Sequence, residues 1–182
     1  MNHNPVLTTL FPCERLPALG PGQPNSAVKS QLESLTLEKI FDGATITNHD
    51  MAQCCLSGLW LAHDFLDESH RISQDINTPE GSYWHGIMHR REPDYSNAKY
   101  WFRRVGRHEV FDSLSVAARE LAQQFPPDRP AQFLMTSYDP MMFIDLCESI
   151  ANGQSTSETL ARRVAQAEWQ LLFEHCYRAA TA

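Results

Sequence analysis

The sequence predicts an all-α protein: a single compact helical domain of about six or seven helices, preceded by an extended, proline-rich N-terminal arm. From residue 26 onward, apolar residues recur at helical spacing in one segment after another. Capping residues, glycines and prolines separate those segments. The only strand-like run, 132–137, has no second strand to pair with. We therefore expect an arm at 1–26 and one helical domain at 27–182.

The arm is defined by its prolines. Five of the 11 prolines lie within the first 26 residues. Proline fixes φ and removes a backbone donor, so we expect an extended segment rather than a packed element. Phe11 and Leu16 are candidates for docking on the body or on a second subunit. A homodimer held by the arm is therefore one interpretation.

Local signals place the helices in order. Asn48, Asp94 and Asp139 are expected N-caps, and Pro140 suits a first helical position. Segment 48–72 is apolar on much of its circumference, so we expect it to be the central helix. The run Ser155–Glu158 has the form of a capping box. The expected helices are 26–41, 48–72, 83–91, 95–105, 110–124, 140–152 and 155–180.

The charge of the chain limits its partners. A net charge of −7 over 182 residues argues against a general nucleic-acid binder, because such proteins are normally basic. Positive charge is nevertheless concentrated between His89 and His108. There, six of the 15 lysines and arginines stand against two acidic residues, which gives the block a charge of +4. A local site for an anion is compatible with the acidic total.

The cysteine pattern and the length of the apolar runs bear on the cellular compartment of the protein. The five cysteines are odd in number and form no CxxC pair, so a reducing cytoplasm is the simplest expectation. The first residues do not have the pattern of a signal peptide, and the apolar runs are too short to span a bilayer. We expect a soluble, cytoplasmic protein with no membrane or nucleic-acid partner.

Histidines form the first candidate site. His63, Asp67 and His70 are spaced i, i+4 and i+7. His85 and His89 lie four residues apart, with Glu92 one turn further on. Two such faces, brought together, would bind a divalent metal such as Zn, Fe or Mn, or serve as catalytic acid and base. The alternative is a set of structural histidines. The candidate catalytic residues and metal ligands are His63, His70, His85 and His89, with Asp67 and Glu92 as further metal ligands.

The basic, aromatic block around the later histidines forms the second candidate site. Guanidinium groups suit phosphate or carboxylate, and aromatic rings stack on planar groups. The alternative is a core network in which the arginines pair with Glu92, Asp64 or Asp67. The candidate ligand-binding residues are Arg90, Arg91, Lys99, Arg103, Tyr100 and Trp101.

Residues 63–111, which include WHGIMHRREPDYSNAKYWFRRVG, resemble an uncharacterised family of hypothetical proteins that share a stretch of this kind. The resemblance covers about a quarter of the chain. That family has no assigned activity, so the resemblance implies no catalytic residue and no cofactor. Standard signatures such as GxxxxGK[ST], GxGxxG, HExxH and GxSxG are absent from the sequence. Function must therefore be inferred from side-chain chemistry.

Two functions remain open. The first is an enzyme that acts on a small phosphate- or carboxylate-bearing molecule, using the histidine cluster and an arginine and lysine clamp, with or without a metal. The second is a non-catalytic helical module that binds a ligand or a protein. The first requires the histidines and the basic residues to converge, whereas the second allows each to be satisfied separately.

Overall fold

A computed structural model describes residues 5–11 and 16–182, and within these ranges it is all-α with no strand. Seven of the described α-helices have eight or more residues, which equals the expected number, although two of them come from the single expected helix 48–72 and none from 26–41. The helices are α1 (Pro5–Leu10), α2 (Lys29–Glu33), α3 (Leu37–Phe41), α4 (His49–Ala62), α5 (Leu66–Ser73), α6 (Pro79–Arg91), α7 (Tyr95–Val105), α8 (Glu109–Gln124), α9 (Pro140–Ala151) and α10 (Glu158–Ala180), with 3₁₀ segments at Ser26–Val28 and Arg129–Met135.

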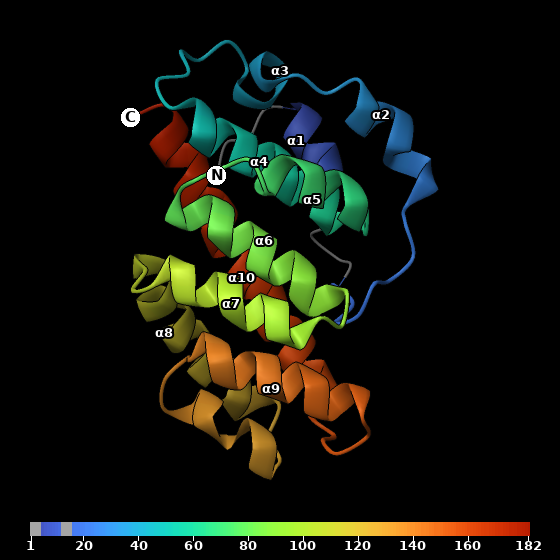
Figure 1. Ribbon diagram of the computed structural model, residues 1–182, viewed down its shortest axis with the longest axis vertical. Coiled ribbons are helices and arrows are strands. Elements are labelled where there is room, and N and C mark those ends of the chain that lie inside the picture. Colours follow the sequence, from blue (N-terminus) through green and yellow to red (C-terminus); the bar gives the residue numbers. More distant parts are fainter. Residues whose placement is uncertain (1–4, 12–15) are drawn as a thin grey trace.

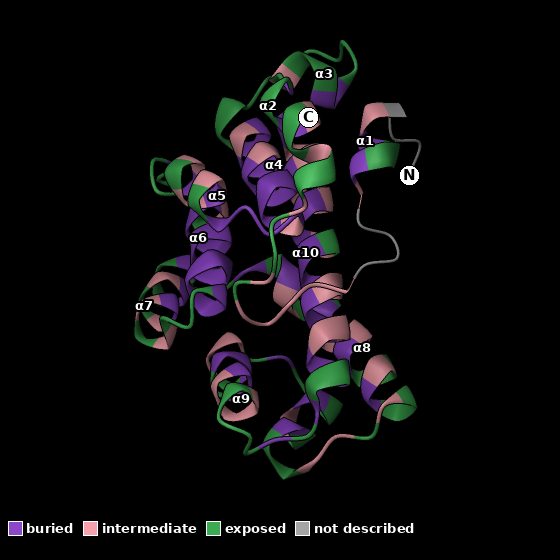
Figure 2. Ribbon diagram, turned by 90° about the vertical axis from the view of Figure 1, so that its right-hand side faces the viewer, coloured by how far each residue is buried: buried purple, intermediate pink, exposed green. Residues whose placement is uncertain are grey.

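The helices are arranged around α6 and α10. α6 packs against α4, α5 and α7, while the long α10 packs against α4, α8 and α9 (Figure 1). Every residue of α6 from Gly81 to Arg91 is buried (Figure 2). α6 is therefore enclosed on all sides, and polar side chains on it must find partners inside the protein.

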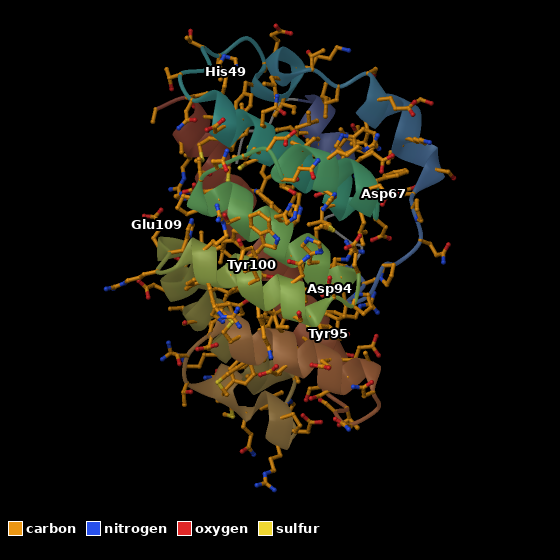
Figure 3. The ribbon with its side chains drawn as sticks, in the orientation of Figure 1. His49, Asp67, Asp94, Tyr95, Tyr100 and Glu109 are labelled. Atoms are coloured by element: carbon orange, nitrogen blue, oxygen red, sulfur yellow. The ribbon has the colours of Figure 1, made fainter. Side chains whose placement is uncertain are left out.

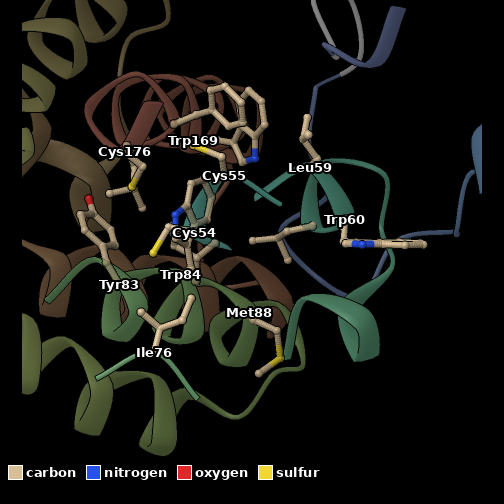
Figure 4. Close-up of a cluster of buried hydrophobic side chains, with 14 of the residues drawn as sticks. Cys54, Cys55, Leu59, Trp60, Ile76, Tyr83, Trp84, Met88, Trp169 and Cys176 are labelled. Carbon is tan, nitrogen blue, oxygen red and sulfur yellow. The ribbon is translucent and has the colours of Figure 1, made fainter. Parts of the chain in front are cut away.

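Close helix packing depends on two glycines. A Cβ at Gly58 of α4 would lie 2.8 Å from the Trp84 ring, and one at Gly86 of α6 would lie 2.8 Å from the Phe102 ring. Each glycine therefore lets a large ring approach a neighbouring helix. Trp84 belongs to the buried cluster that joins α4, α6 and α10 (Figure 4).

The predicted caps are confirmed. The side chains of Asn48, Asp94 and Asp139 accept hydrogen bonds from the first-turn amides of α4, α7 and α9. Thr78 caps α6 in the same way, with Pro79 at its first position. The starts at Asn48, Asp94 and Asp139 were predictable because capping involves residues close together in sequence, whereas α6 begins at Pro79, four residues before the expected start at 83.

The expected helix at 48–72 is wrong, because the chain breaks at His63 and Asp64. Asp64 has a positive φ of 65°, and its carboxylate forms a buried ion pair with Arg91. The backbone amide of Gln23 also donates to Asp64, at 3.2 Å. These contacts come from distant parts of the chain and outweigh the local preference for one continuous helix.

Two other local expectations need correction. The segment expected as one helix over 26–41 divides at Thr36, which caps α3 by accepting from Lys39 N. The strand-like run at 132–137 lies largely within the 3₁₀ segment Arg129–Met135. Both changes keep the fold helical.

The N-terminal arm is not wholly extended. Residues 5–10 form α1, and Leu7 and Leu10 are fully buried against the body. Phe11 docks as expected, with its ring 5.0 Å from that of Phe173 and 5.3 Å from that of Trp169. Pro12, one of the five prolines of the arm, belongs to residues 12–15, which lie outside the described residues. No helix in the described part of the chain is both long and apolar enough to cross a bilayer.

Candidate metal centre

Two helices bring three imidazole rings together. His70 comes from α5, and His85 and His89 lie one turn apart on α6. One ring nitrogen of each histidine lies within 4.8 Å of the others. His85 and His89 are only 2% and 6% exposed, whereas His70 is half-buried. The three-histidine cluster therefore has two enclosed rings and one that reaches the surface.

Hydrogen bonds orient the two enclosed rings. The Nε2 atoms of His85 and His89 face each other at 2.9 Å. Nδ1 of His89 lies 3.1 Å from Oε2 of Glu92, and Nδ1 of His85 lies 3.0 Å from Oγ of Ser73. An ionised carboxylate only accepts hydrogen bonds, so neutral His89 carries its proton on Nδ1. Its Nε2 lone pair therefore points into the cluster.

The hydroxyl of Ser73 decides what His85 presents. If it donates to Nδ1 of His85, then Nε2–H of His85 donates to His89, and the network is closed without a metal. If it donates instead to the Ser69 carbonyl 2.9 Å away, it can accept from Nδ1–H of His85. Both Nε2 lone pairs then converge. Rotation of one hydroxyl, with a change of tautomer, would therefore leave both Nε2 lone pairs available to a cation.

The geometry and charge of the cluster fit a transition metal. Two imidazole nitrogens on a tetrahedral zinc lie about 3.3 Å apart, so the 2.9 Å pair needs to open only slightly. Burial, reinforced by the neighbouring rings of His89 and His70, lowers the pKa of His85 to about 3. Burial also lowers the pKa of His89, although Glu92 opposes that shift. Neutral imidazoles are the form that binds metals.

α7 closes one side of the cluster. The ring of Trp101 lies 4.2 Å from that of His85, measured between centroids. Nδ2 of Asn97 lies 3.2 Å from Nε2 of His89, and a turn of the amide would place Oδ1 there instead. Trp101 was expected to bind ligand, and its position against His85 is consistent with that role. Asn97 was not predicted.

Two predicted ligands lie elsewhere. His63 Nε2 donates to the carbonyl of Leu10 at 2.8 Å, and its Nδ1 accepts from Asn25 at 3.3 Å. Because α4 ends before His63, this ring does not share a face with His70 and instead joins the N-terminal segment to the body. Asp67 is exposed on α5 (Figure 3) and does not belong to the three-histidine group. Glu92 supports His89 rather than completing a ligand set.

The expected anion clamp does not form at its two arginines. Arg90 is buried and pairs with Glu168, with Nη1 3.3 Å from Oε1, and Tyr138 donates to the same carboxylate at 2.7 Å. Arg91 pairs with Asp64 and donates to the Leu61 carbonyl at 2.8 Å. The alternative interpretation, ion pairs within the core, describes both residues. Of the carboxylates proposed for them, only Asp64 takes part.

The other three candidates occupy the outside of α7. Lys99 forms an ion pair with Asp145 of α9. Tyr100 is 48% exposed, and its ring meets that of Trp101 edge to face at 5.5 Å (Figure 3). Arg103 is exposed. Lys99 and Arg103 thus project away from the three-histidine cluster, which the sequence could not show without the packing of α7 on α6.

A second histidine cluster lies at the start of α6. Glu80, His108 and His175 also bring ligand atoms within 4.8 Å of one another. Oε1 of Glu80 lies 3.1 Å from Nε2 of His175 and 3.6 Å from Nε2 of His108. Nδ1 of His108, however, accepts a hydrogen bond from the Val110 amide at 3.2 Å. Neutral His108 therefore carries a proton on Nε2, which opposes metal binding there.

This glutamate–histidine cluster behaves as an ion-pair network. His175 lies between Glu80 and Glu109, whose Oε1 is 2.8 Å from its Nδ1. The hydrogen bond with Glu80 acts against the effect of burial, with help from Glu109, and raises the pKa of His175 to about 9. Burial opposes ionisation of Glu80, but hydrogen bonds from His108 and His175 bring its pKa below the usual range. Sequence spacing gave no sign of this cluster, because its members come from α6, the N-cap of α8 and α10.

Searches of protein-family models, curated proteins and solved structures find no match to this chain. The resemblance of residues 63–111 to a family of hypothetical proteins therefore stays a prediction. The interpretation of the site rests on its geometry.

Proposed function

We propose that the protein binds a divalent transition metal through His70, His85 and His89, and that it hydrolyses a small anionic substrate. The observation that supports this most is the convergence of the two Nε2 atoms on α6, whose Nδ1 atoms are held by Glu92 and Ser73. Metal-bound histidines commonly use their second nitrogen in this way. The histidine from α5 supplies a third ligand.

The ligand set favours catalysis over a purely structural metal. Structural zinc sites usually have four protein ligands, whereas catalytic sites have three and keep a position for water. A bound metal would lower the pKa of that water and supply hydroxide near neutral pH. Three neutral imidazoles suit zinc best, with iron and manganese as alternatives. Trp101 would exclude solvent on one side, and Glu92 would hold the proton on Nδ1 of His89.

A non-catalytic module is the second candidate. It is favoured by the closed network that runs from Ser73 through His85 and His89 to Glu92. It is also favoured by the internal pairing of Arg90 and Arg91, which removes the expected clamp. In this function the cluster would serve to stabilise α6, and metal would have no effect on it.

Metal titration separates the two functions. Protein without a histidine tag would be titrated with Co²⁺, followed by its visible absorption and by competition with Zn²⁺. We expect one tightly bound ion with a tetrahedral spectrum, and His85→Ala or His70→Ala should weaken binding at least 100-fold. His49→Ala is the matched control, because His49 is exposed at the start of α4, away from α6 and α7 (Figure 3).

The catalytic step needs its own measurement. Zinc-loaded protein would be assayed against activated phosphate and carboxylate esters, with the His85→Ala protein as the blank. Turnover that requires both the metal and His85 supports the proposal. Absence of a stoichiometric ion, or equal binding by all variants, would overturn the metal site. Metal binding without turnover across the ester panel would overturn the proposed hydrolysis and leave only the metal site.

A further inference from the structure

One face of α7 follows the three-histidine cluster from end to end. Asn97, Trp101 and Arg104 are spaced i, i+4 and i+7, so they share that face. Asn97 lies beside His89 and Trp101 beside His85. The guanidinium carbon of Arg104 lies 5.1 Å from the Trp101 ring centroid. Arg104 is thus separated from the His85 ring by no more than one tryptophan side chain.

Among the described residues, three cations of the block have no carboxylate partner, namely Arg103, Arg104 and Arg107, and of these three Arg104 alone lies over the Trp101 ring. Arg90, Arg91 and Lys99 are each neutralised by an ion pair. In the part of the chain that the structure describes, no carboxylate lies within ion-pair distance of Arg104. Its guanidinium group lies over the Trp101 ring, and the residue is exposed, so its N–H donors remain accessible to an anion.

Charge is distributed unevenly along this face. Glu92 and Asp94 lie at the His89 end, where Glu92 follows the last residue of α6 and Asp94 caps α7, whereas Arg104 lies at the opposite end of α7. An anion approaching the cluster would be repelled from the first end and attracted to the second. The charge distribution therefore fixes which way round a small anionic molecule would bind.

We propose that Arg104 is the anion-binding residue of the three-histidine site, and that the substrate is a compact molecule with a phosphate or carboxylate group. This inference rests on the proposed function, because it takes the cluster as the reacting centre. The planar guanidinium group binds two oxygens of either anion through parallel hydrogen bonds. Trp101 holds that group beside His85, so only a small substrate can reach both.

A simpler role for Arg104 makes a different prediction. Arg103 and Arg104 both lie in the last turn of α7, where any cation interacts favourably with the helix dipole. A dipole role would make the two arginines equivalent, whereas an anion site would not. Arg103 is therefore the matched control, since it has the same charge, is likewise exposed, and lies one residue away.

The test measures anion binding by cobalt-loaded protein. Inorganic phosphate and acetate would be titrated separately at low ionic strength, followed by the cobalt absorption bands and by calorimetry. We expect Arg104→Gln to weaken binding of the preferred anion at least 10-fold and Arg103→Gln to change it less than 2-fold. Arg104→Lys should give an intermediate loss, because it keeps the charge but not the paired donors. The stronger of the two probes identifies the substrate group.

Two failures are distinguishable. If the wild-type protein does not bind cobalt, the proposed function falls and this inference falls with it. If cobalt binds normally in every variant, but Arg104→Gln and Arg103→Gln have the same effect on anion affinity, only the role of Arg104 is overturned. Thermal unfolding of each apo variant would show whether either substitution alters the fold.

Discussion

Helix α6 carries a histidine cluster toward each end, and the two clusters are built from similar residues with opposite hydrogen-bond polarity. In the three-histidine cluster, Nδ1 of His89 donates to a carboxylate, so its Nε2 is a lone pair facing inward. In the glutamate–histidine cluster, Nδ1 of His108 accepts from the Val110 amide, so its Nε2 carries a proton facing Glu80. The first arrangement suits a cation, and the second suits a carboxylate.

The difference shows that the nitrogen opposite the site decides what a histidine can bind. Both groups have three ligand atoms within 4.8 Å, so proximity alone does not separate them. The partner on the far nitrogen sets the tautomer, and the tautomer sets whether the near nitrogen is a donor or an acceptor. Metal is therefore expected at one end of α6 and a stabilising ion pair at the other.

The largest expected effect is stabilisation of the wild-type protein by metal. A ligand at 100 times its dissociation constant adds about 2.7 kcal/mol to the free energy of unfolding. We expect Zn²⁺ to raise the thermal midpoint accordingly, and His89→Ala to abolish the rise. His175→Gln, in the other cluster, should keep it. A rise that survives His89→Ala but is lost with His175→Gln would reverse the assignment of the two clusters.

Removing the carboxylate of the second cluster should cost somewhat less. Glu80→Ala removes the acceptor of Nε2–H of His175, at 3.1 Å, and the carboxylate that faces Nε2–H of His108, at 3.6 Å. An unsatisfied buried polar group costs about 1–3 kcal/mol. Chemical denaturation should show a loss in that range, with zinc affinity unchanged. Weaker zinc binding, with no loss of stability, would show that Glu80 is a ligand after all.

Local patterns in the sequence predicted the starts of α4, α7 and α9 and part of the candidate site. The caps at Asn48, Asp94 and Asp139 depend on contacts within three residues, so they could be recognised without the fold. The pair His85 and His89 was recognisable from its spacing in the same way. The predicted capping box failed because Asp128, almost 30 residues away, accepts from the hydroxyls of Ser155 and Ser157.

Long-range contacts explain why the rest was missed. His70 was predicted as a ligand, but together with His63 on one continuous helix. That helix ends because Arg91 binds Asp64 across 27 residues, a contact that no local pattern reveals. Ser73 and Asn97 were not predicted because their roles depend on how α5 and α7 pack on α6. Arg90 and Arg91 were expected to bind an anionic ligand. Both are buried instead, and they form ion pairs with Glu168 and Asp64 inside the protein.

Ser73 offers a more selective test of the three-histidine cluster. Ser73→Ala removes the group that fixes Nδ1 of His85, and loss of such a partner typically weakens metal affinity 10–100-fold. We expect about 10-fold weaker zinc binding, measured by competition with a chelator. Ser57→Ala is the matched control, since Ser57 bonds to Ser69 in the same buried hydroxyl chain without contacting His85. Equal effects of the two variants would show that Ser73 acts only through stability.

The smallest expected effect is the pH dependence that the second cluster confers. The folded-state pKa of His175, raised to about 9 chiefly by its hydrogen bond with Glu80, lies above the ordinary value of 6.5. Its contribution to stability is therefore complete below about pH 6.5 and is lost as the pH rises through 9. The unfolding free energy of the wild type should fall more steeply over this interval than that of His175→Gln, by less than about 1.4 kcal/mol per pH unit, the slope for one full proton.

At low pH the sign reverses for Glu80. Because its pKa is lowered in the folded protein, its contribution to stability is present above about pH 4.5 and is lost on acidification. Parallel pH profiles of the unfolding free energy for the wild type and His175→Gln from pH 6.5 to 9 would show that His175 is not protonated between its two carboxylates. The polarity assigned to this end of α6 would then be wrong.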